Sequence, residues 1–112
     1  MKWCKIPDVK KIDQPFIKKV KVDNKSICLI GYEGDLFAVS AICPHAREDL
    51  SRGWCENGKL VCPVHRFSYN LQTGRGSEGQ NDYVETYSVE VRGDDIYIGI
   101  TGFWEKVKQG LK

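Results

Sequence analysis

The sequence contains two histidines, and each closes a short motif that a cysteine opens. The first motif is Cys43-Pro44-His45 and the second is Cys62-Pro63-Val64-His65, with sixteen residues between them. Imidazole nitrogens and thiolate sulfurs are ligands that suit zinc and iron. The two motifs therefore predict a metal site made of two cysteines and two histidines.

The distribution of ligand types between the motifs favours one kind of site. A zinc finger usually takes two cysteines from one segment and two histidines from another, whereas each segment here supplies one of each. An asymmetric two-iron cluster needs this distribution, because one iron takes both cysteines and the other takes both histidines. We expect two facing loops that hold such a cluster from opposite sides. A zinc-stabilised interaction module without a redox role stays open as an alternative, which visible colour and iron analysis would exclude.

The residues around the two motifs resemble a known family. Residues 43–74 are similar to a Rieske [2Fe-2S] domain, with Tyr69 as the aromatic residue after the second motif and Thr73-Gly74 as a turn. A looser similarity extends over residues 2–101. Within the family, the chain resembles the small soluble ferredoxins of ring-hydroxylating oxygenase systems and the small subunits of NAD(P)H-dependent nitrite reductases. The resemblance implies an all-β Rieske iron-sulfur fold, a small antiparallel β-sandwich with a cluster-binding subdomain.

The resemblance also implies a role for each ligand of one [2Fe-2S] cluster. Cys43 and Cys62 would bind the inner iron as thiolates, which donate charge and keep that iron ferric. His45 and His65 would bind the outer iron, nearest to solvent. Because imidazoles are neutral, the outer iron is the one expected to accept the electron, at a higher potential than in clusters with four thiolates.

Three positions bear on the reduction potential. Respiratory Rieske proteins carry an additional disulfide and a serine near the second motif, whereas this chain has Val64 and Phe67 at the corresponding positions. These differences predict a potential near the low end of the Rieske range of about −150 to +300 mV. Tyr69 matches a tyrosine that hydrogen-bonds a ligand sulfur in the high-potential members. We expect its hydroxyl to raise the potential slightly.

Length and composition predict one domain over residues 1–112. A chain of 112 residues with 41% hydrophobic content is enough for one modest core. The sequence has no apolar run of about 18 residues and no apolar signal segment, so we expect a cytoplasmic protein that does not insert into membranes. Five cysteines cannot all pair in disulfides, so a reducing compartment is expected. Cys28 is expected to be a buried apolar residue. Cys55 is expected to be an inert thiol, with an oxidation-prone thiol or an alternative metal contact as the other possibilities. The role of Cys4 stays open.

Alternating apolar residues predict strands along most of the chain. Turn residues at Asp23-Asn24, Glu33-Gly34 and Gly93-Asp94 separate several of these strands. The cluster-binding subdomain is expected over about 42–83, and within it residues 74–79 and Asn81-Asp82 are interpreted as exposed turns. The expected strands cover 16–22, 26–32, 36–41, 59–61, 84–91 and 96–100, and a short amphipathic helix over 103–111 is expected to pack on the sheet.

No catalytic residues are predicted outside the metal site. With both imidazoles used as ligands, no histidine is left as a general base, and a mononuclear iron site would need two further histidines. The lysines near the start of the chain accompany no nucleic-acid-binding motif. We therefore expect a one-electron carrier, monomeric when free, between a flavoprotein reductase and a terminal oxygenase. The alternative is a small Rieske subunit of a nitrite reductase; in either case the chemistry belongs to the partner.

Overall fold

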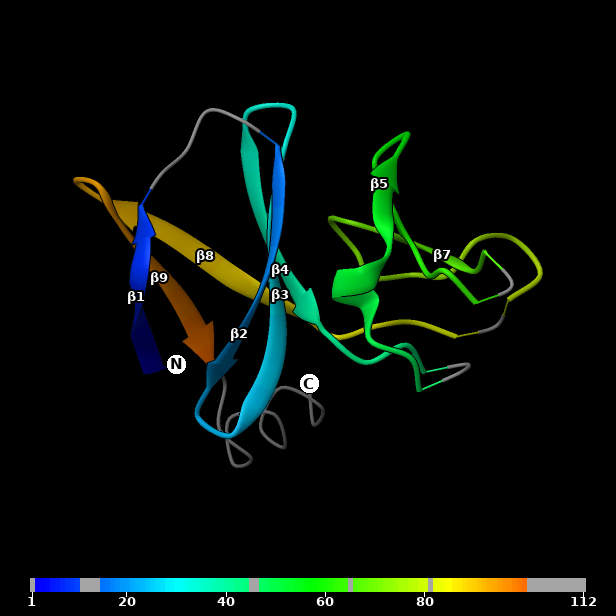
Figure 1. Ribbon diagram of the computed structural model, residues 1–112, viewed down its shortest axis with the longest axis horizontal. Helices are drawn as coiled ribbons and strands as arrows, with labels where there is room; N and C mark the ends of the chain where they lie inside the picture. Colours follow the sequence, from blue (N-terminus) through cyan, green and yellow to red (C-terminus); the bar gives the residue numbers. More distant parts are fainter. Residues whose placement is uncertain (1, 11–14, 45–46, 65, 81, 101–112) are drawn as a thin grey trace, which may run out of the picture.

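The fold is shown by a computed structural model, which describes residues 2–10, 15–44, 47–64, 66–80 and 82–100 (Figure 1). His45, His65 and the predicted helix over 103–111 lie outside the described residues. Within the described ranges the chain forms strands and one short 3-10 helix, in agreement with the predicted all-β class. The elements are β1 (Lys2–Lys10), β2 (Phe16–Val22), β3 (Lys25–Tyr32), β4 (Asp35–Ser40), η1 (Leu50–Arg52), β5 (Trp54–Glu56), β6 (Lys59–Val61), β7 (Ser68–Asn70), β8 (Thr86–Arg92) and β9 (Asp95–Ile100).

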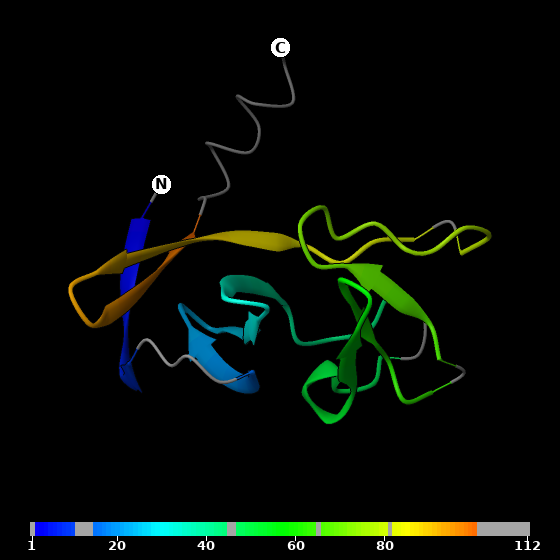
Figure 2. The ribbon, with the colours of Figure 1, turned by 90° about the horizontal axis from the view of Figure 1, so that it is seen from above.

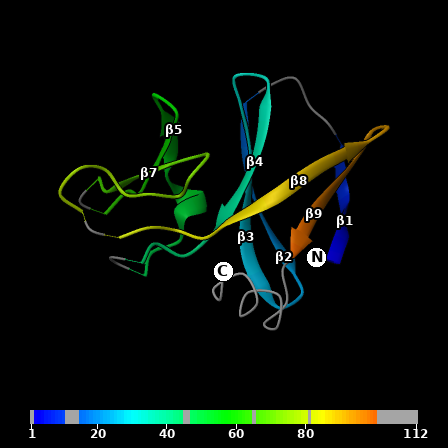
Figure 3. The same cartoon turned by 180° about the vertical axis from the view of Figure 1, so that it is seen from behind.

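The strands form two antiparallel sheets. One has six strands in the order β1-β9-β8-β4-β3-β2, and the other has three strands in the order β5-β6-β7. The six-stranded sheet is held together at its middle by two residue pairs between β4 and β8, and Figure 3 shows β8 leaving the end of β4 obliquely. Its two halves consequently face each other as the layers of a small sandwich, beside the three-stranded sheet (Figure 2).

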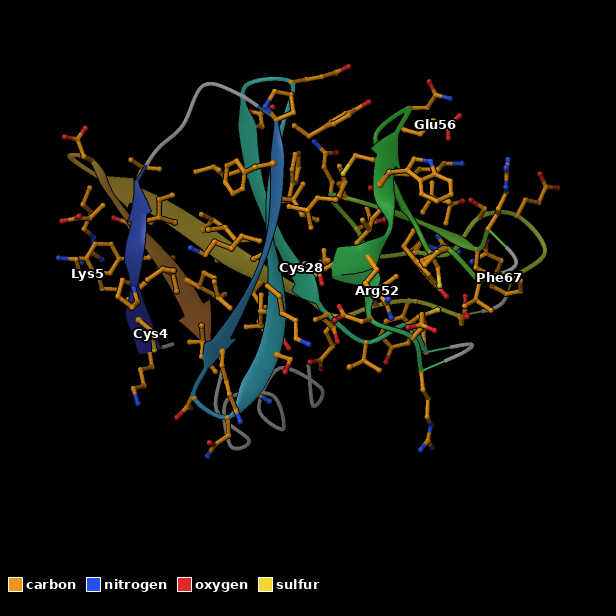
Figure 4. The ribbon with its side chains drawn as sticks, in the orientation of Figure 1. Cys4, Lys5, Cys28, Arg52, Glu56 and Phe67 are labelled. Carbon is orange, nitrogen blue, oxygen red and sulfur yellow. The ribbon has the colours of Figure 1, made fainter. Side chains whose placement is uncertain are left out.

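β3 is the central strand of the fold, and both of its faces are buried. Ile27 and Leu29 belong to a hydrophobic cluster between the two halves of the six-stranded sheet. Cys28 and Ile30 belong to a second cluster, which joins that sheet to the three-stranded sheet (Figure 4). Successive side chains of a strand point to opposite faces, so a strand buried on both sides needs a continuous apolar run. β3 thereby connects the scaffold to the segment that contains the two motifs.

Tight turns fix the register of the hairpins. Type I′ turns need positive φ at both central residues and match the twist of the flanking strands. Gly93 alone has positive φ in the turn between β8 and β9, as a type II′ turn requires. The turns with positive φ at both central residues, as type I′ requires, are Asp23-Asn24, Glu33-Gly34 and Asn57-Gly58.

The structure differs from the sequence-based expectations in several strands. β1 and the short strands β5 and β7 were not predicted, and the predicted strand over 84–91 begins two residues later, at Thr86. Val84 lies before this strand, is buried in the second cluster, and donates its N–H to the carbonyl of Gly74 at 2.8 Å. In the described part of the chain no helix has the length and apolar character needed to cross a bilayer.

Candidate metal centre

Two loops of matching hydrogen-bond geometry hold Cys43 and Cys62. The N–H of Cys43 donates to the carbonyl of Glu48 at 2.9 Å, and the N–H of Cys62 donates to the carbonyl of Phe67 at 2.7 Å. Each cysteine is therefore tied to the residue five positions later, and each motif lies within the loop that this bond closes. The residue before each acceptor is an arginine with positive φ, 54° at Arg47 and 56° at Arg66. Two loops of different sequence consequently have the same backbone hydrogen bond and the same positive φ before its acceptor.

The Cys62 loop starts from the three-stranded sheet, and the Cys43 loop follows β4. Cys62 follows β6 directly, and β6 lies between β5 and β7 in its sheet. Before Cys43, Ala41 accepts a hydrogen bond from the N–H of Leu50 at 2.7 Å and donates its own N–H to Ser26 at 3.0 Å. Leu50 is fully buried beneath the loop. The cysteines are thus anchored to buried strands and not to free loop ends.

The structure brings Cys43 and Cys62 together in the second hydrophobic cluster. Both side chains are 0% exposed, neither forms a disulfide, and the two thiols are close enough to interact directly. Burial is the main reason that the pKa of the Cys62 thiol is raised above its usual value, and the neighbouring Cys43 raises it further. The backbone N–H of Val64 acts in the opposite direction by donating to the Cys62 sulfur.

This donor set fits the cysteine half of an iron-sulfur site. Two adjacent buried thiolates lack solvation and repel each other, and a cation bound between them would offset this electrostatic cost. Iron bound by thiolate sulfur, with a backbone amide directed at one sulfur, is the arrangement that such clusters use.

Tyr69 lies directly against this pair. Its side chain on β7 is 0% exposed, and its hydroxyl oxygen is 3.4 Å from the sulfur of Cys43. Burial, followed by the neighbouring Cys43 and Asp82, raises the pKa of the Tyr69 hydroxyl above its usual value, so it stays protonated. The expected contact of Tyr69 with the sulfur of Cys43, a predicted ligand, is thus present in the structure.

A second set of contacts fixes the end of the Cys43 loop. Asp49 Oδ1 accepts hydrogen bonds from the N–H and the hydroxyl of Ser51, at 2.9 and 2.6 Å, and thereby caps η1. Its other oxygen is 3.0 Å from Lys19 Nζ on β2. These bonds, above all that from the Ser51 hydroxyl, hold the pKa of Asp49 below its usual value. The Asp49 carboxylate thus connects the loop to the edge strand of the large sheet.

Replacement of Asp49 by alanine is expected to reduce the free energy of unfolding at pH 7 by about 1 kcal/mol, the usual effect of losing a helix cap. Because the pKa of Asp49 is lower in the folded state than its unfolded value of 3.8, its contribution is complete above that pH. It is lost as the pH falls through the lower, folded-state pKa. Urea unfolding of both proteins at several pH values measures the difference.

Lys19→Met is the matched control, since it removes the exposed ion pair and leaves the cap. Its effect should be smaller than that of Asp49→Ala, because exposed ion pairs contribute little. A stability difference between wild type and Asp49→Ala that is the same at pH 3 and pH 7 would contradict the assigned role of the carboxylate.

Exposed side chains surround the cysteine loops. The guanidinium of Arg66 lies 6.0 Å from the ring centroid of Trp54, which is 38% exposed. On the side of the first loop, a groove is lined by Ile42, Pro44 and Tyr83 together with polar residues. Ile42 and Tyr83 are 45% and 66% exposed, which is high for large apolar side chains. A protein partner could bury this apolar surface.

Of the four predicted ligands, the structure describes the two cysteines. His45 and His65 lie outside the described residues, so their role stays a prediction. Cys28 is fully buried as expected, and burial raises the pKa of its thiol to about 12, which makes it unreactive. Cys55 is half-buried and packs against the same hydrophobic cluster as Cys28.

The interpretation of residues 74–79 and Asn81-Asp82 as exposed turns was partly wrong, and Asn81 lies outside the described residues. Gly74 is buried against the carbonyl of Val84, and the Asp82 carboxylate accepts a hydrogen bond from the Tyr69 hydroxyl at 3.1 Å. Nothing in the local sequence distinguishes this aspartate from a surface turn residue. Only the fold brings it to Tyr69, thirteen positions away in the sequence.

Comparison with known proteins identifies the class. A model of the Rieske [2Fe-2S] domain matches residues 2–88. The chain is 26% identical over 101 residues to the ferredoxin component of the naphthalene 1,2-dioxygenase system of Pseudomonas aeruginosa, covering 89% of this chain and 97% of that protein. It is 36% identical over 77 residues to a 3-phenylpropionate/cinnamic acid dioxygenase ferredoxin subunit of Photorhabdus laumondii, covering 67% and 73%.

Solved structures share the fold. One is a chain of the complex of reduced oxygenase and oxidized ferredoxin in carbazole 1,9a-dioxygenase, with a TM-score of 0.71, 21% identity, and coverage of 79% of this chain and 92% of that one. Another is described as an NADH-dependent nitrite reductase small subunit from Mycobacterium tuberculosis, with a TM-score of 0.75, 18% identity, and coverage of 89% and 96%.

The family model spans well over half of the sequence, and the chain therefore belongs to the Rieske [2Fe-2S] family. Its cofactor is a [2Fe-2S] cluster, which favours iron over the zinc alternative. Within that family it is an electron carrier of the ferredoxin type.

Proposed function

We propose that the protein carries single electrons from a flavoprotein reductase to a terminal oxygenase. In this proposal Cys43 and Cys62 bind one iron of the cluster, and His45 and His65 bind the other. The observation that supports it most strongly is the pair of fully buried, unpaired thiols that two matching loops bring together. When bound, the cluster takes up and releases one electron.

The protein controls where that electron passes. The two sulfurs are closed off by the hydrophobic cluster, so a partner cannot approach the cysteine ligands. The electron therefore enters and leaves on the side of the histidine ligands. The exposed apolar residues Ile42, Pro44 and Tyr83 beside the first loop supply a surface on which an oxygenase can dock.

The choice of an oxygenase as acceptor is supported by the relatives. Both sequence relatives are named as ferredoxin parts of dioxygenase systems. The likeness to the nitrite reductase small subunit, at 18% identity, supports the fold alone. That second function stays the alternative to be tested.

We further propose that residues 1–112 form one Rieske domain, with the cluster-binding part at about 42–83, and that the free protein is a cytoplasmic monomer. The thiols of Cys4, Cys28 and Cys55, unpaired in the structure, support a reducing compartment. The three-stranded sheet, whose strands run from Trp54 to Asn70, falls inside the proposed cluster-binding part.

Purification of the tagged protein from its native cells tests the carrier function. A carrier is expected to elute as a free monomer and, after reduction with dithionite, to pass one electron per chain to cytochrome c under anaerobic conditions. Recovery in a fixed ratio with a larger reductase polypeptide would contradict the free carrier and favour the nitrite reductase alternative. Failure to transfer an electron would contradict both.

A further inference from the structure

The hydroxyl of Tyr69 lies between two hydrogen-bond acceptors. The sulfur of Cys43 is 3.4 Å from the hydroxyl oxygen, and Oδ2 of Asp82 is 3.1 Å from it. Tyr69 is fully buried, whereas Asp82 is half-buried and reaches the hydroxyl from outside the hydrophobic cluster. The three groups form a chain from the surface of the protein to a predicted ligand of the cluster.

The Asp82 carboxylate is held in place on both of its oxygens. While Oδ2 accepts from Tyr69, Oδ1 accepts from the side-chain amide of Gln80 at 3.2 Å. Gln80 in turn binds the backbone of Ser68 in both directions: its Nε2 donates to the Ser68 carbonyl at 3.1 Å, and its Oε1 accepts from the Ser68 N–H at 3.0 Å. Ser68 precedes Tyr69 on β7, so the same strand positions the tyrosine and the carboxylate.

A phenol has one proton to donate, and here two groups compete for it. Cysteine sulfur that binds iron carries no proton, so it can only accept from Tyr69. Sulfur is a weak acceptor, whereas an ionised carboxylate oxygen accepts one of the stronger hydrogen bonds found in proteins. The Tyr69 proton therefore goes to Asp82, and the sulfur of Cys43 faces the hydroxyl oxygen without receiving its proton.

We propose that Asp82 is a positioning residue that lowers the reduction potential of the cluster by directing the Tyr69 hydroxyl proton away from the sulfur of Cys43. The inference rests on the proposed ligand role of Cys43. A hydrogen bond to a ligand sulfur stabilises the reduced, more negative cluster and so raises the potential. The presence of this tyrosine alone thus does not predict a raised potential, because the residue on its other side decides where the proton points.

A set of three variants tests the proposal: Asp82→Asn, Tyr69→Phe and the double variant. The measurement is the midpoint potential, from a redox titration followed by electron paramagnetic resonance. Tyr69→Phe alone is expected to change the potential little, because in the wild type the proton is already committed to Asp82. Asp82→Asn is expected to raise the potential, since the asparagine amide can donate to the hydroxyl oxygen and leave the proton for the sulfur.

The double variant separates this mechanism from the simple loss of a negative charge. Loss of charge acts through space and would raise the potential equally with or without Tyr69. The proposal instead predicts that Asp82→Asn raises the potential clearly more with Tyr69 present than in the Tyr69→Phe background. Equal shifts in the two backgrounds would overturn the proposal, and so would a large fall in potential for Tyr69→Phe alone.

If Asp82→Asn does not fold, Asp82→Ala gives the same comparison, because alanine also frees the proton of Tyr69. If the wild-type protein shows no Rieske-type signal, the proposed function fails and not merely the role of Asp82. A wild-type signal with equal shifts in both backgrounds would overturn the role of Asp82 alone.

Discussion

Replacing Cys62 with serine is expected to give a protein with almost no bound iron. The Cys62 side chain is fully buried beside Cys43, and a serine hydroxyl there would be a far poorer ligand for iron than a thiolate. Because binding of a metal contributes directly to the stability of a small domain, the variant should also unfold at a lower temperature. Iron and sulfide per chain, the visible absorption and the thermal midpoint measure these effects.

Cys4→Ser is the matched control for this experiment. Cys4 lies on β1, at the opposite end of the molecule from Phe67, the residue that closes the Cys62 loop (Figure 4). The control variant should keep the iron content and colour of the wild type. Full iron content in Cys62→Ser would remove that cysteine from the ligand set, and equal iron loss in both variants would point to a general effect of serine substitution.

Gly74→Ala is expected to destabilise the cluster-binding part strongly. Gly74 has φ of +78°, which disfavours a side chain by about 1 kcal/mol. A β-carbon there would also lie 2.1 Å from the carbonyl oxygen of Val84. The N–H of Val84 donates to the carbonyl of Gly74 at 2.8 Å, so the two backbone segments are held together. Moving that backbone is expected to cost about 2 kcal/mol more, as overpacking does.

Gly79→Ala supplies the comparison, because Gly79 has φ of +90° but nothing within 4 Å of the added β-carbon. Both variants share the backbone strain, and only Gly74→Ala has the collision. The thermal midpoint of Gly74→Ala should therefore lie about 10 °C below that of Gly79→Ala, for a further loss of about 2 kcal/mol. Equal thermal midpoints would show that the collision of the added β-carbon with Val84 does not destabilise the protein.

The local features of the fold could be predicted from the sequence. Asp23, Asn24 and Gly34 are of residue types that tolerate positive φ, and the structure has positive φ at these positions, as it also has at Glu33. The continuous apolar run around Cys28 likewise indicated a buried strand, and β3 is buried on both faces. In these cases the physical cause acts between residues that are neighbours in the sequence.

Features that depend on distant partners could not be predicted in this way. β1 contains Pro7 and has no regular alternation, and it becomes a strand because it pairs with β9 at the other end of the described chain. The same reason explains why Asp82 was interpreted as a turn residue. Its role follows from the position of Tyr69 in space and not from the residues that surround it in the sequence.

The sequence pointed to residues that the structure brings together, but not to their surroundings. The paired motifs indicated Cys43 and Cys62, and the resemblance to the family indicated Tyr69, which lies against them. The contacts that fix these residues, such as Asp49 with Lys19 and Gln80 with Ser68, became visible only in the structure. Their side chains have ordinary surface character, so composition gives no signal for them.

Electron paramagnetic resonance of the dithionite-reduced protein shows whether two cysteines and two histidines share one [2Fe-2S] cluster. We expect a Rieske-type signal with a low average g value, and a changed spectrum with a lower potential in His65→Cys, because a thiolate then replaces a neutral ligand. A signal typical of a cluster with four thiolates, or a spectrum that His65→Cys leaves unchanged, would contradict this ligand set.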